Sequence, residues 1–331
     1  MMNKKLLSLA VLILVLSSWV GSAKAQYIAD TFGSGANQFT LDFTTVGNTN
    51  QAADPTTGYG NVPYTYAMGA YSISQNQLNV AAANGLQGVP GGAYSGDLPA
   101  SDVSWYQAAA FVNWLNTSKG YSPAYDLTYS SGAYSMSLWQ SGQSGYDPSN
   151  PFRNSQAVYV LPSVDEYYKA AFGLSDGSGY TLYADGSNTV PTAVASGTNA
   201  GTAVYNNSGI LARPASVFEA GGLSSYGTMG QVGNIFLMTE TSTNGVNTNA
   251  ADPRIVRGAF WESQASILPS TYSGYYSDAT ATNIDTLGFS VAKITSNVPE
   301  PSTYALFGLG ALALIVAYRR KVSKGCNLEI L

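Results

Sequence analysis

The sequence has no histidine and a single cysteine, Cys326, among its 331 residues. Without histidine, the chain cannot build a Ser-His-Asp triad, a histidine-ligated zinc or iron site, or acid–base catalysis by imidazole. A single cysteine cannot form a disulfide within the chain, and it stands close to the C-terminal end, away from the body of the protein. The commonest hydrolytic and thiol-dependent chemistries are therefore excluded for that body.

Charge is also scarce, since Asp, Glu, Lys and Arg make up only 10% of the chain. Residues 26–298 hold 7 Lys and Arg against 17 Asp and Glu, a net charge of −10. An acidic body argues against nucleic acid as a partner. It is compatible with binding of divalent cations, although an acidic solvated surface explains the same composition.

Glycine and tyrosine are abundant, with 35 and 24 residues. So much glycine predicts many turns and loops, while apolar residues at 45% of the chain argue against disorder. The roughly 270 residues between the two ends are enough for one large domain or two small ones.

Residues 1–25 have the features of a secretory signal peptide. Lys4 and Lys5 precede an apolar run over residues 6–20, and small residues follow up to Ala23 and Ala25. We expect the Sec translocon to export the chain and cleavage to follow Ala25. A buried core helix is the alternative, but no polar face interrupts the run.

A second apolar run, residues 302–318, lies near the C-terminus. In a helix it would be about 25 Å long, enough to span a bilayer with some local adjustment. The basic residues that follow should stay in the cytoplasm. We therefore predict a linker at 295–301, a transmembrane helix at 302–318 and a cytoplasmic tail at 319–331.

This ending resembles the PEP-CTERM sorting signal of Gram-negative bacteria, in which a Pro-Glu-Pro motif precedes an apolar helix and a basic cluster. The residues that carry the resemblance are Val298, Pro299, Glu300, Pro301, Arg319 and Arg320. The resemblance implies that a membrane protease, the exosortase, cuts at the motif, so that the anchor is temporary and the body reaches the cell surface or extracellular matrix. A permanent single-span anchor is the alternative.

Within the body, periodicity predicts three helices, at 75–83, 101–115 and 163–172. The first follows a strand at 66–74, and the last begins with Ser163 three residues before Glu166, the spacing of a capping box. We attribute Asp165 and Glu166 to the favourable charge at a helix N-terminus. The other segments are expected as an edge strand with loops at 26–63, loops at 173–209, a turn entering a strand at 222–237, and closing strands at 254–261 and 287–293.

Five segments in order resemble the formylglycine-generating enzyme, or sulfatase-modifying factor, family. They are 68–77 (MGAYSISQNQ), 103–108 (VSWYQA), 161–167 (LPSVDEY), 226–236 (YGTMGQVGNIF), and 257–261 (RGAFW) with 288–289 (GF). The resemblance implies an α+β, loop-rich domain of the complex C-type-lectin type over residues 64–294, after an N-terminal extension at 26–63. Tyrosine-rich loops on such a scaffold often form binding surfaces.

The resemblance also implies where catalysis should occur. Oxidases of the family hold copper with two cysteines, whose places here fall near Ser263 and Leu268. A second branch holds iron with histidines, which this chain lacks, so neither copper nor iron is expected. A structural calcium ion is the remaining candidate, with Asn234 and Asp252 as ligands. Leu237, however, stands where the family has an acidic ligand, and a turn explains Asn234 better than a calcium site does.

We therefore predict an exported, exosortase-sorted surface or matrix protein. Its domain would have a binding or structural role and would catalyse no reaction. Its partners would be a surface polysaccharide or an envelope protein. One alternative is an enzyme of the formylglycine-generating or nonheme-metal family with an unrecognised active site. Another is an all-β matrix protein in which the motif matches are accidental.

Overall fold

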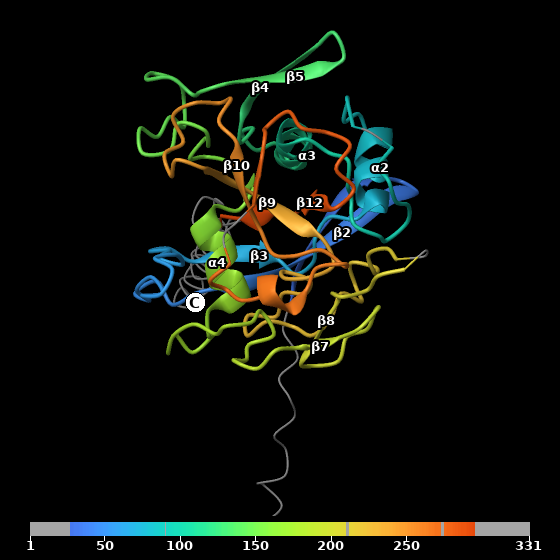
Figure 1. Ribbon diagram of the computed structural model, residues 1–331. Coiled ribbons are helices and arrows are strands. Elements are labelled where there is room, and N and C mark those ends of the chain that lie inside the picture. Colours follow the sequence, from blue (N-terminus) through green and yellow to red (C-terminus); the bar gives the residue numbers. More distant parts are fainter. Residues whose placement is uncertain (1–26, 90, 210–211, 273–274, 295–331) are drawn as a thin grey trace, which may run out of the picture.

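The computed structural model describes residues 27–89, 91–209, 212–272 and 275–294 (Figure 1). The signal peptide, the Pro-Glu-Pro motif, the apolar run at 302–318 and the basic tail lie outside the described residues. Within the described ranges, no helix is both long enough and apolar enough to cross a membrane.

The described residues form a mixed α/β domain with few helices and long connecting loops. The helices are α2 (Gln75–Ala83), α3 (Trp105–Ser118), α4 (Val164–Phe172) and the 3-10 turn η1 (Ala265–Ile267). The strands are β1 (Ile28–Ser34), β2 (Asn37–Val46), β3 (Tyr66–Gly69), β4 (Asp126–Ser130), β5 (Ala133–Ser137), β6 (Tyr159–Val160), β7 (Thr192–Ala193), β8 (Thr202–Ala203), β9 (Phe236–Ser242), β10 (Arg254–Arg257), β11 (Tyr275–Ser277), β12 (Leu287–Phe289) and β13 (Ala292–Lys293).

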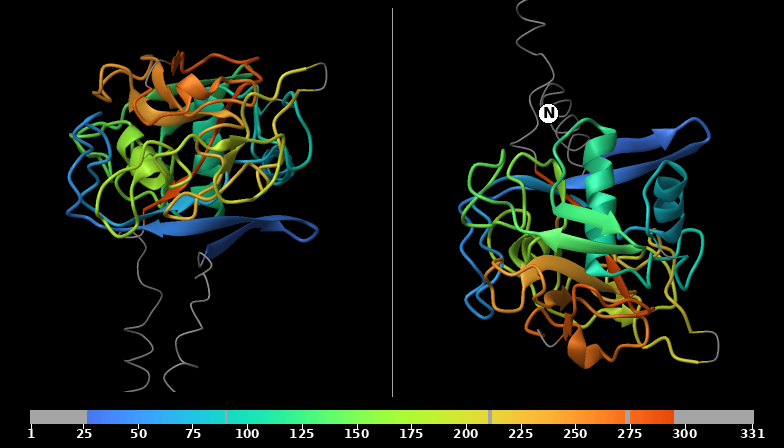
Figure 2. Two further views of the ribbon diagram at one scale, coloured as in Figure 1. Left: turned by 60° about the horizontal axis from the view of Figure 1, so that its bottom comes forward. Right: turned by 90° about the horizontal axis from the view of Figure 1, so that it is seen from above.

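The larger sheet has the order β1-β2-β3-β13-β6. Its long β1–β2 hairpin runs along one side of the molecule, where Figure 2 shows it in blue. Because β2 pairs with β3, the hairpin shares a sheet with the first of the family-like segments. The sequence predicted an edge strand with loops for this region, from the alternation at 39–43. Those residues lie instead in β2, which has a neighbouring strand on each side, and the edge strand is β1.

The smaller sheet has the order β11-β10-β9-β12. The closing segment predicted as one strand at 287–293 is divided, because β12 pairs in parallel with β9 whereas β13 pairs with β3 and β6 of the larger sheet. Residues 287–293 therefore join the two sheets. Phe289, the last residue of β12, is fully buried, and Val291, just before β13, is almost fully buried.

Each α-helix begins with the same local arrangement, a capping box. The hydroxyls of Ser74, Ser104 and Ser163 accept from the backbone amide three residues later, and the side chain of that later residue accepts from the serine's backbone amide. The predicted capping box of α4 is thereby confirmed. The strand expected at 66–74 is shorter than predicted, because Ser74 leaves the β3 direction to cap α2.

The core lies between the sheets and α3, which runs lengthwise through the right-hand view of Figure 2. The spacing of the apolar residues predicts a stripe on this helix at Ala108, Phe111, Trp114 and Leu115; three of them are completely buried and Trp114 is partly buried. The helix predicted at 101–115 spans 105–118, because Ser104 caps it. The β4–β5 hairpin, which we did not predict, projects at the top of Figure 1. A signal for it is present, because apolar and polar residues alternate in both strands on either side of the turn at Ser131 and Gly132.

Candidate functional site

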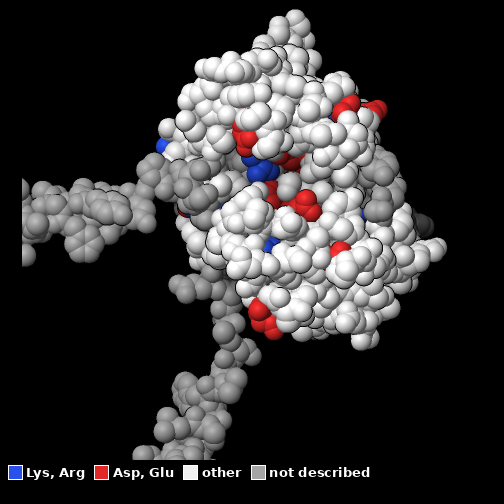
Figure 3. Space-filling model, turned by 90° about the vertical axis from the view of Figure 1, so that its left-hand side faces the viewer, with Lys and Arg blue, Asp and Glu red and all other residues white. Residues whose placement is uncertain are grey.

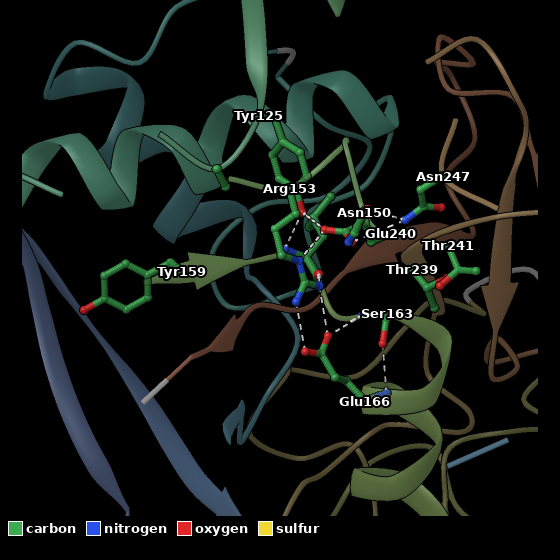
Figure 4. Close-up of polar contacts among 12 residues, drawn as sticks. Tyr125, Asn150, Arg153, Tyr159, Ser163, Glu166, Thr239, Glu240, Thr241 and Asn247 are labelled. Carbon is green, nitrogen blue, oxygen red and sulfur yellow. Dashed lines mark hydrogen bonds and ion pairs between the residues drawn. The ribbon is translucent and has the colours of Figure 1, made fainter. Parts of the chain in front are cut away.

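The most concentrated polar arrangement in the described residues joins Arg153 to Glu166 and Glu240. Arg153 comes from the loop between β5 and β6, Glu166 from the first turn of α4, and Glu240 from the middle of β9. Both carboxylate side chains are fully buried, and the arginine side chain is 11% exposed. Figure 4 shows the guanidinium lying between the two carboxylates, so that three separate segments converge on one cation.

Arg153 binds Glu166 through two parallel contacts. Nη1 and Nη2 of the guanidinium lie 3.0 Å from Oε1 and Oε2 of the carboxylate. The Nε atom donates to Glu240 at 2.8 Å, and Nη2 also donates to the carbonyl of Leu161 at 2.9 Å. This fork geometry is the strongest form of arginine–carboxylate pairing. The guanidinium is consequently engaged at all three nitrogens.

The carboxylates are satisfied by further donors. Glu166 accepts from the hydroxyl of Tyr64 at 2.7 Å and from the backbone amide of Ser163 at 2.6 Å. Glu240 accepts from the hydroxyl of Tyr125 and from the amide of Asn150, each at 2.7 Å. Both buried carboxylates therefore have hydrogen-bond donors besides Arg153.

The protonation states follow from this arrangement. Burial alone would raise the pKa of Glu166, but the Arg153 charge and the hydrogen bonds outweigh it and lower that pKa. Burial would likewise lower the pKa of Arg153, but the two glutamates raise it well above its usual value. The pKa of Tyr125 is raised by burial and by Glu240. The Arg153–Glu166 pair is therefore held in its charged form near neutral pH.

Figure 3, viewed from the left-hand side of Figure 1, shows a hollow in which basic and acidic side chains lie together. The grouping of opposite charges is consistent with mutual neutralisation on this face. With its donors and acceptors already paired, the Arg153 cluster acts as a clamp between α4, β9 and the β5–β6 loop.

Three more cations are buried against carbonyl groups. Arg254, Arg257 and Lys169 are at most 3% exposed, and each donates to two main-chain oxygens. Arg254 also lies between the rings of Trp105 and Phe152, 4.4 and 4.3 Å from their centroids. Burial lowers its pKa to about 10. None of the three forms an ion pair in the described part of the chain. Their hydrogen bonds to main-chain carbonyl groups give them a structural role.

Ser263 and Leu268, near which the resemblance places the family's two cysteines, lie on either side of η1. Ser263 is 4% exposed, and its hydroxyl accepts from the backbone amide of Phe260 at 2.9 Å. Leu268 is 1% exposed and packs in the main core. A hydroxyl already used in a turn and a buried alkyl group do not fit a copper ion, which in this position would require two thiolates.

The two residues predicted as calcium ligands are engaged with other protein groups. The side-chain amide of Asn234 accepts from the backbone amide of Ala215 at 2.7 Å and donates to the Ala215 carbonyl at 3.2 Å. Asp252 accepts from the side-chain amides of Asn244 and Asn249. Asn234 has a positive φ of 66°, which asparagine tolerates, so the turn interpretation accounts for it. The described residues contain no group of three or more acidic, cysteine or histidine residues placed to hold a metal ion.

Sequence reasoning placed Glu166 at a helix N-terminus but missed its ion pair, and it missed Arg153 and Glu240 altogether. The available signal was the scarcity of basic residues, since residues 26–298 contain only 7 of them. In a chain so poor in charge, an arginine in a loop whose other charged residue is Asp147 is a candidate for a buried ion pair. No local pattern, however, connects it with a glutamate 87 residues later.

Comparisons with known proteins agree with the sequence resemblances. Residues 30–294 match the sulfatase-modifying factor enzyme 1-like domain, and residues 297–321 match the PEP-CTERM protein-sorting motif. The sorting motif implies that exosortase processes the chain and that the protein is exported and sorted to the cell surface. Comparison with curated proteins finds no match.

Two solved structures share the fold at low identity. Treponema denticola variable protein 1 is 18% identical with a TM-score of 0.52, covering 81% of this chain and 99% of that one. The structure titled CarF is also 18% identical with a TM-score of 0.52, covering 77% of this chain and 98% of that one. At this identity the likeness concerns the fold alone. The match over residues 30–294 spans most of the chain, which therefore belongs to the sulfatase-modifying factor enzyme 1-like domain family.

Proposed function

We propose that the body of this protein is a non-catalytic binding or structural module, displayed on the cell surface or in the extracellular matrix after exosortase processing. The observation that carries the proposal is that residues 26–298 contain no cysteine, so the cysteine pair of the family's oxidases is missing. The resemblance places that pair near Ser263 and Leu268. The serine hydroxyl is used within a turn and the leucine is part of the core. Neither position can supply a thiolate.

Two further features support the proposal. The chain has no histidine, which removes the ligands of the nonheme iron branch. The Arg153 cluster joins charged groups whose donors and acceptors are paired with each other, an arrangement that stabilises a loop-rich fold. We assign the fold to the complex C-type-lectin type, as the family resemblance implies. A calcium ion at Asn234 and Asp252 is not part of the proposal, because protein groups already occupy those side chains.

The proposal is tested with the full-length protein purified in detergent and loaded with copper. We expect no oxidation of a cysteine-containing peptide and no stoichiometric Cu(I) binding. The matched variant carries Ser263→Cys and Leu268→Cys together, and it is expected to gain Cu(I) affinity because the two positions flank one turn of 3-10 helix. Turnover by the wild-type protein would overturn the proposal.

A further inference from the structure

An open groove lies between the end of β2, the loop that follows α4 and the turn at 223–227. Its volume is about 360 Å³, at the lower end of the range of small-molecule sites. Thr45 and Ser175 line the groove and are exposed, and Leu223 is 38% exposed, so a ligand can reach its walls. The groove is separate from the Arg153 cluster, no member of which lines it.

Several polar side chains of the groove have hydrogen-bonding capacity that the described residues do not use. The side-chain nitrogen of Asn48 donates to the Ser175 carbonyl and to the Tyr226 hydroxyl, each at 2.9 Å, whereas its side-chain oxygen accepts from no described donor. The hydroxyls of Tyr226 and Ser175 accept from Asn48 and Ser225, and neither has a described acceptor for its own proton. The Thr45 hydroxyl makes no hydrogen bond with the described residues. The groove therefore offers two donors, one acceptor and a hydroxyl that can act as either.

Four main-chain oxygens of the groove, by contrast, are already paired. They accept from side chains, namely Asn48 from Lys169, Ser175 from Asn48, Tyr226 from Thr44 and Gly227 from Tyr27. A peptide that binds as an added strand pairs mainly with main-chain groups. These bonds disfavour such a peptide and leave side-chain hydroxyls and an amide as the recognition groups.

The groove has no charged residue in its lining. Lys169, which donates to the carbonyl of Asn48, is itself fully buried and offers no contact to a ligand. Asp176, next to Ser175 in the sequence, is exposed and would repel an anion. The lining therefore suits a neutral ligand rather than an acidic one.

A row of three aromatic rings begins at the Gly227 end of the groove. The Tyr27 hydroxyl donates to the Gly227 carbonyl at 3.0 Å, the rings of Tyr27 and Tyr71 lie 6.1 Å apart, and those of Tyr71 and Phe218 lie 4.9 Å apart. Phe218 is 40% exposed, and the two tyrosines are partly exposed. Exposed aromatic rings offer a flat apolar surface on which the C–H face of a sugar ring can pack.

We propose that this groove binds a neutral glycan, a chain of uncharged hexoses. Neighbouring hydroxyls of one sugar pair with Asn48, Ser175 and Thr45, since a sugar hydroxyl both donates and accepts. Sugars farther along the chain pack on Tyr71 and Phe218. The inference rests on the proposed binding role of the domain and specifies its ligand class.

The test measures binding to the full-length protein by titration calorimetry and saturation-transfer NMR, in a detergent without a sugar headgroup so that the detergent does not compete. The neutral probes are cellohexaose, maltohexaose and mannohexaose, and the comparison probes are hexagalacturonic acid and a glycine–serine hexapeptide. We expect at least one neutral hexasaccharide to bind, and at least tenfold weaker binding of the acid and the peptide. No binding of any neutral probe up to about 10 mM, or equal binding of the acid or the peptide, would overturn the inference.

The groove is tested with two substitutions at Thr45. Thr45→Trp fills the groove, and because tryptophan is favourable in strands we expect a folded protein with at least tenfold weaker glycan binding. Thr45→Val removes only the hydroxyl and should weaken binding about three- to tenfold, which keeps the test decisive if the larger residue folds poorly. Thr128→Trp is the matched control, because Thr128 is an exposed strand threonine on the distant β4–β5 hairpin, and it should leave binding unchanged.

The aromatic row is tested with Phe218→Ser, which should weaken binding of the hexasaccharide several-fold. Tyr129→Ser is its control, because Tyr129 is also exposed and also pairs with a second ring, at 4.7 Å. Unchanged affinity in both Thr45→Trp and Phe218→Ser would overturn the assignment of this groove. Failure of glycan binding leaves the proposed function standing, whereas peptide oxidation by the copper-loaded wild type would overturn the proposed function whatever the glycan result.

Discussion

Arg153 and Glu166 face each other through two nitrogen–oxygen contacts of 3.0 Å, with the glutamate fully buried. Glu166 also closes the capping box of α4, so one carboxylate fixes both the start of a helix and the loop that carries the arginine. Because Arg153 also pairs with Glu240 of β9, the helix and the smaller sheet are connected through a single side chain. We therefore expect the cluster to determine the stability of the fold.

Replacing Arg153 with methionine should destabilise the protein strongly. The substitution leaves two buried carboxylates without their cation, and removing one partner of a buried ion pair typically costs about 3–5 kcal/mol. Urea denaturation followed by tryptophan fluorescence measures the change. Arg213→Met is the control, because Arg213 is exposed. Equal stabilities of the two variants would contradict a clamping role for the cluster.

The same pair predicts a dependence of stability on pH. The pKa of Glu166 is lowered in the folded protein from its model-compound value of 4.5. The folded state therefore holds the proton less tightly than the unfolded chain, and the stabilisation is complete above about pH 4.5 and lost as the pH falls through the lower folded-state pKa. The difference in free energy of unfolding between the wild type and Glu166→Gln should shrink below pH 4.5. A difference that stays constant from pH 7 to pH 3 would argue against this.

The capping box of α4 and the apolar stripe of α3 could be predicted, because each depends on residues that are close together in the sequence. Ser163 and Glu166 stand three residues apart, and the capping box they predict is present. The stripe of α3 likewise follows from the spacing of its apolar residues, which contact one core. In each case the physical cause lies within one or two helical turns of sequence.

Long-range pairings were not predictable in the same way. Residues 287–293 are divided between two sheets because of where β9 and β3 lie. No sequence pattern within the segment indicates this division. The burial of Gln231 is also not evident from the sequence, since a glutamine in a glycine-rich turn is ordinarily exposed. Burial there results from packing of segments distant along the chain.

Gly258 is expected to tolerate no side chain. Its φ is +88°, and a Cβ at this position would lie 2.6 Å from the carbonyl oxygen of Gln231. Gly258→Ala should therefore cost more than the backbone strain alone, which is about 1–3 kcal/mol for such a conformation. Gly132→Ala is a matched control, because Gly132 has a φ of +83° and open space around the same atom. Thermal unfolding compares the two, and a similar loss of Tm would mean that the close approach to Gln231 has no effect.

The first and last strands of the domain are joined by Lys293 of β13 and Asp30 of β1, whose Nζ and Oδ2 atoms lie 2.6 Å apart. The hydroxyl of Tyr159 donates to the same oxygen at 2.8 Å. Because both charged side chains are partly exposed, at 14% and 19%, screening limits the pair, and Lys293→Met should cost only about 1 kcal/mol. That cost should shrink when the NaCl concentration rises to 1 M, whereas the effect of Arg153→Met should persist because its partners are fully buried. Denaturation of both variants at low and high salt measures the contrast. Equal salt sensitivity would contradict this distinction between the partly exposed pair on the larger sheet and the fully buried carboxylates of the Arg153 cluster.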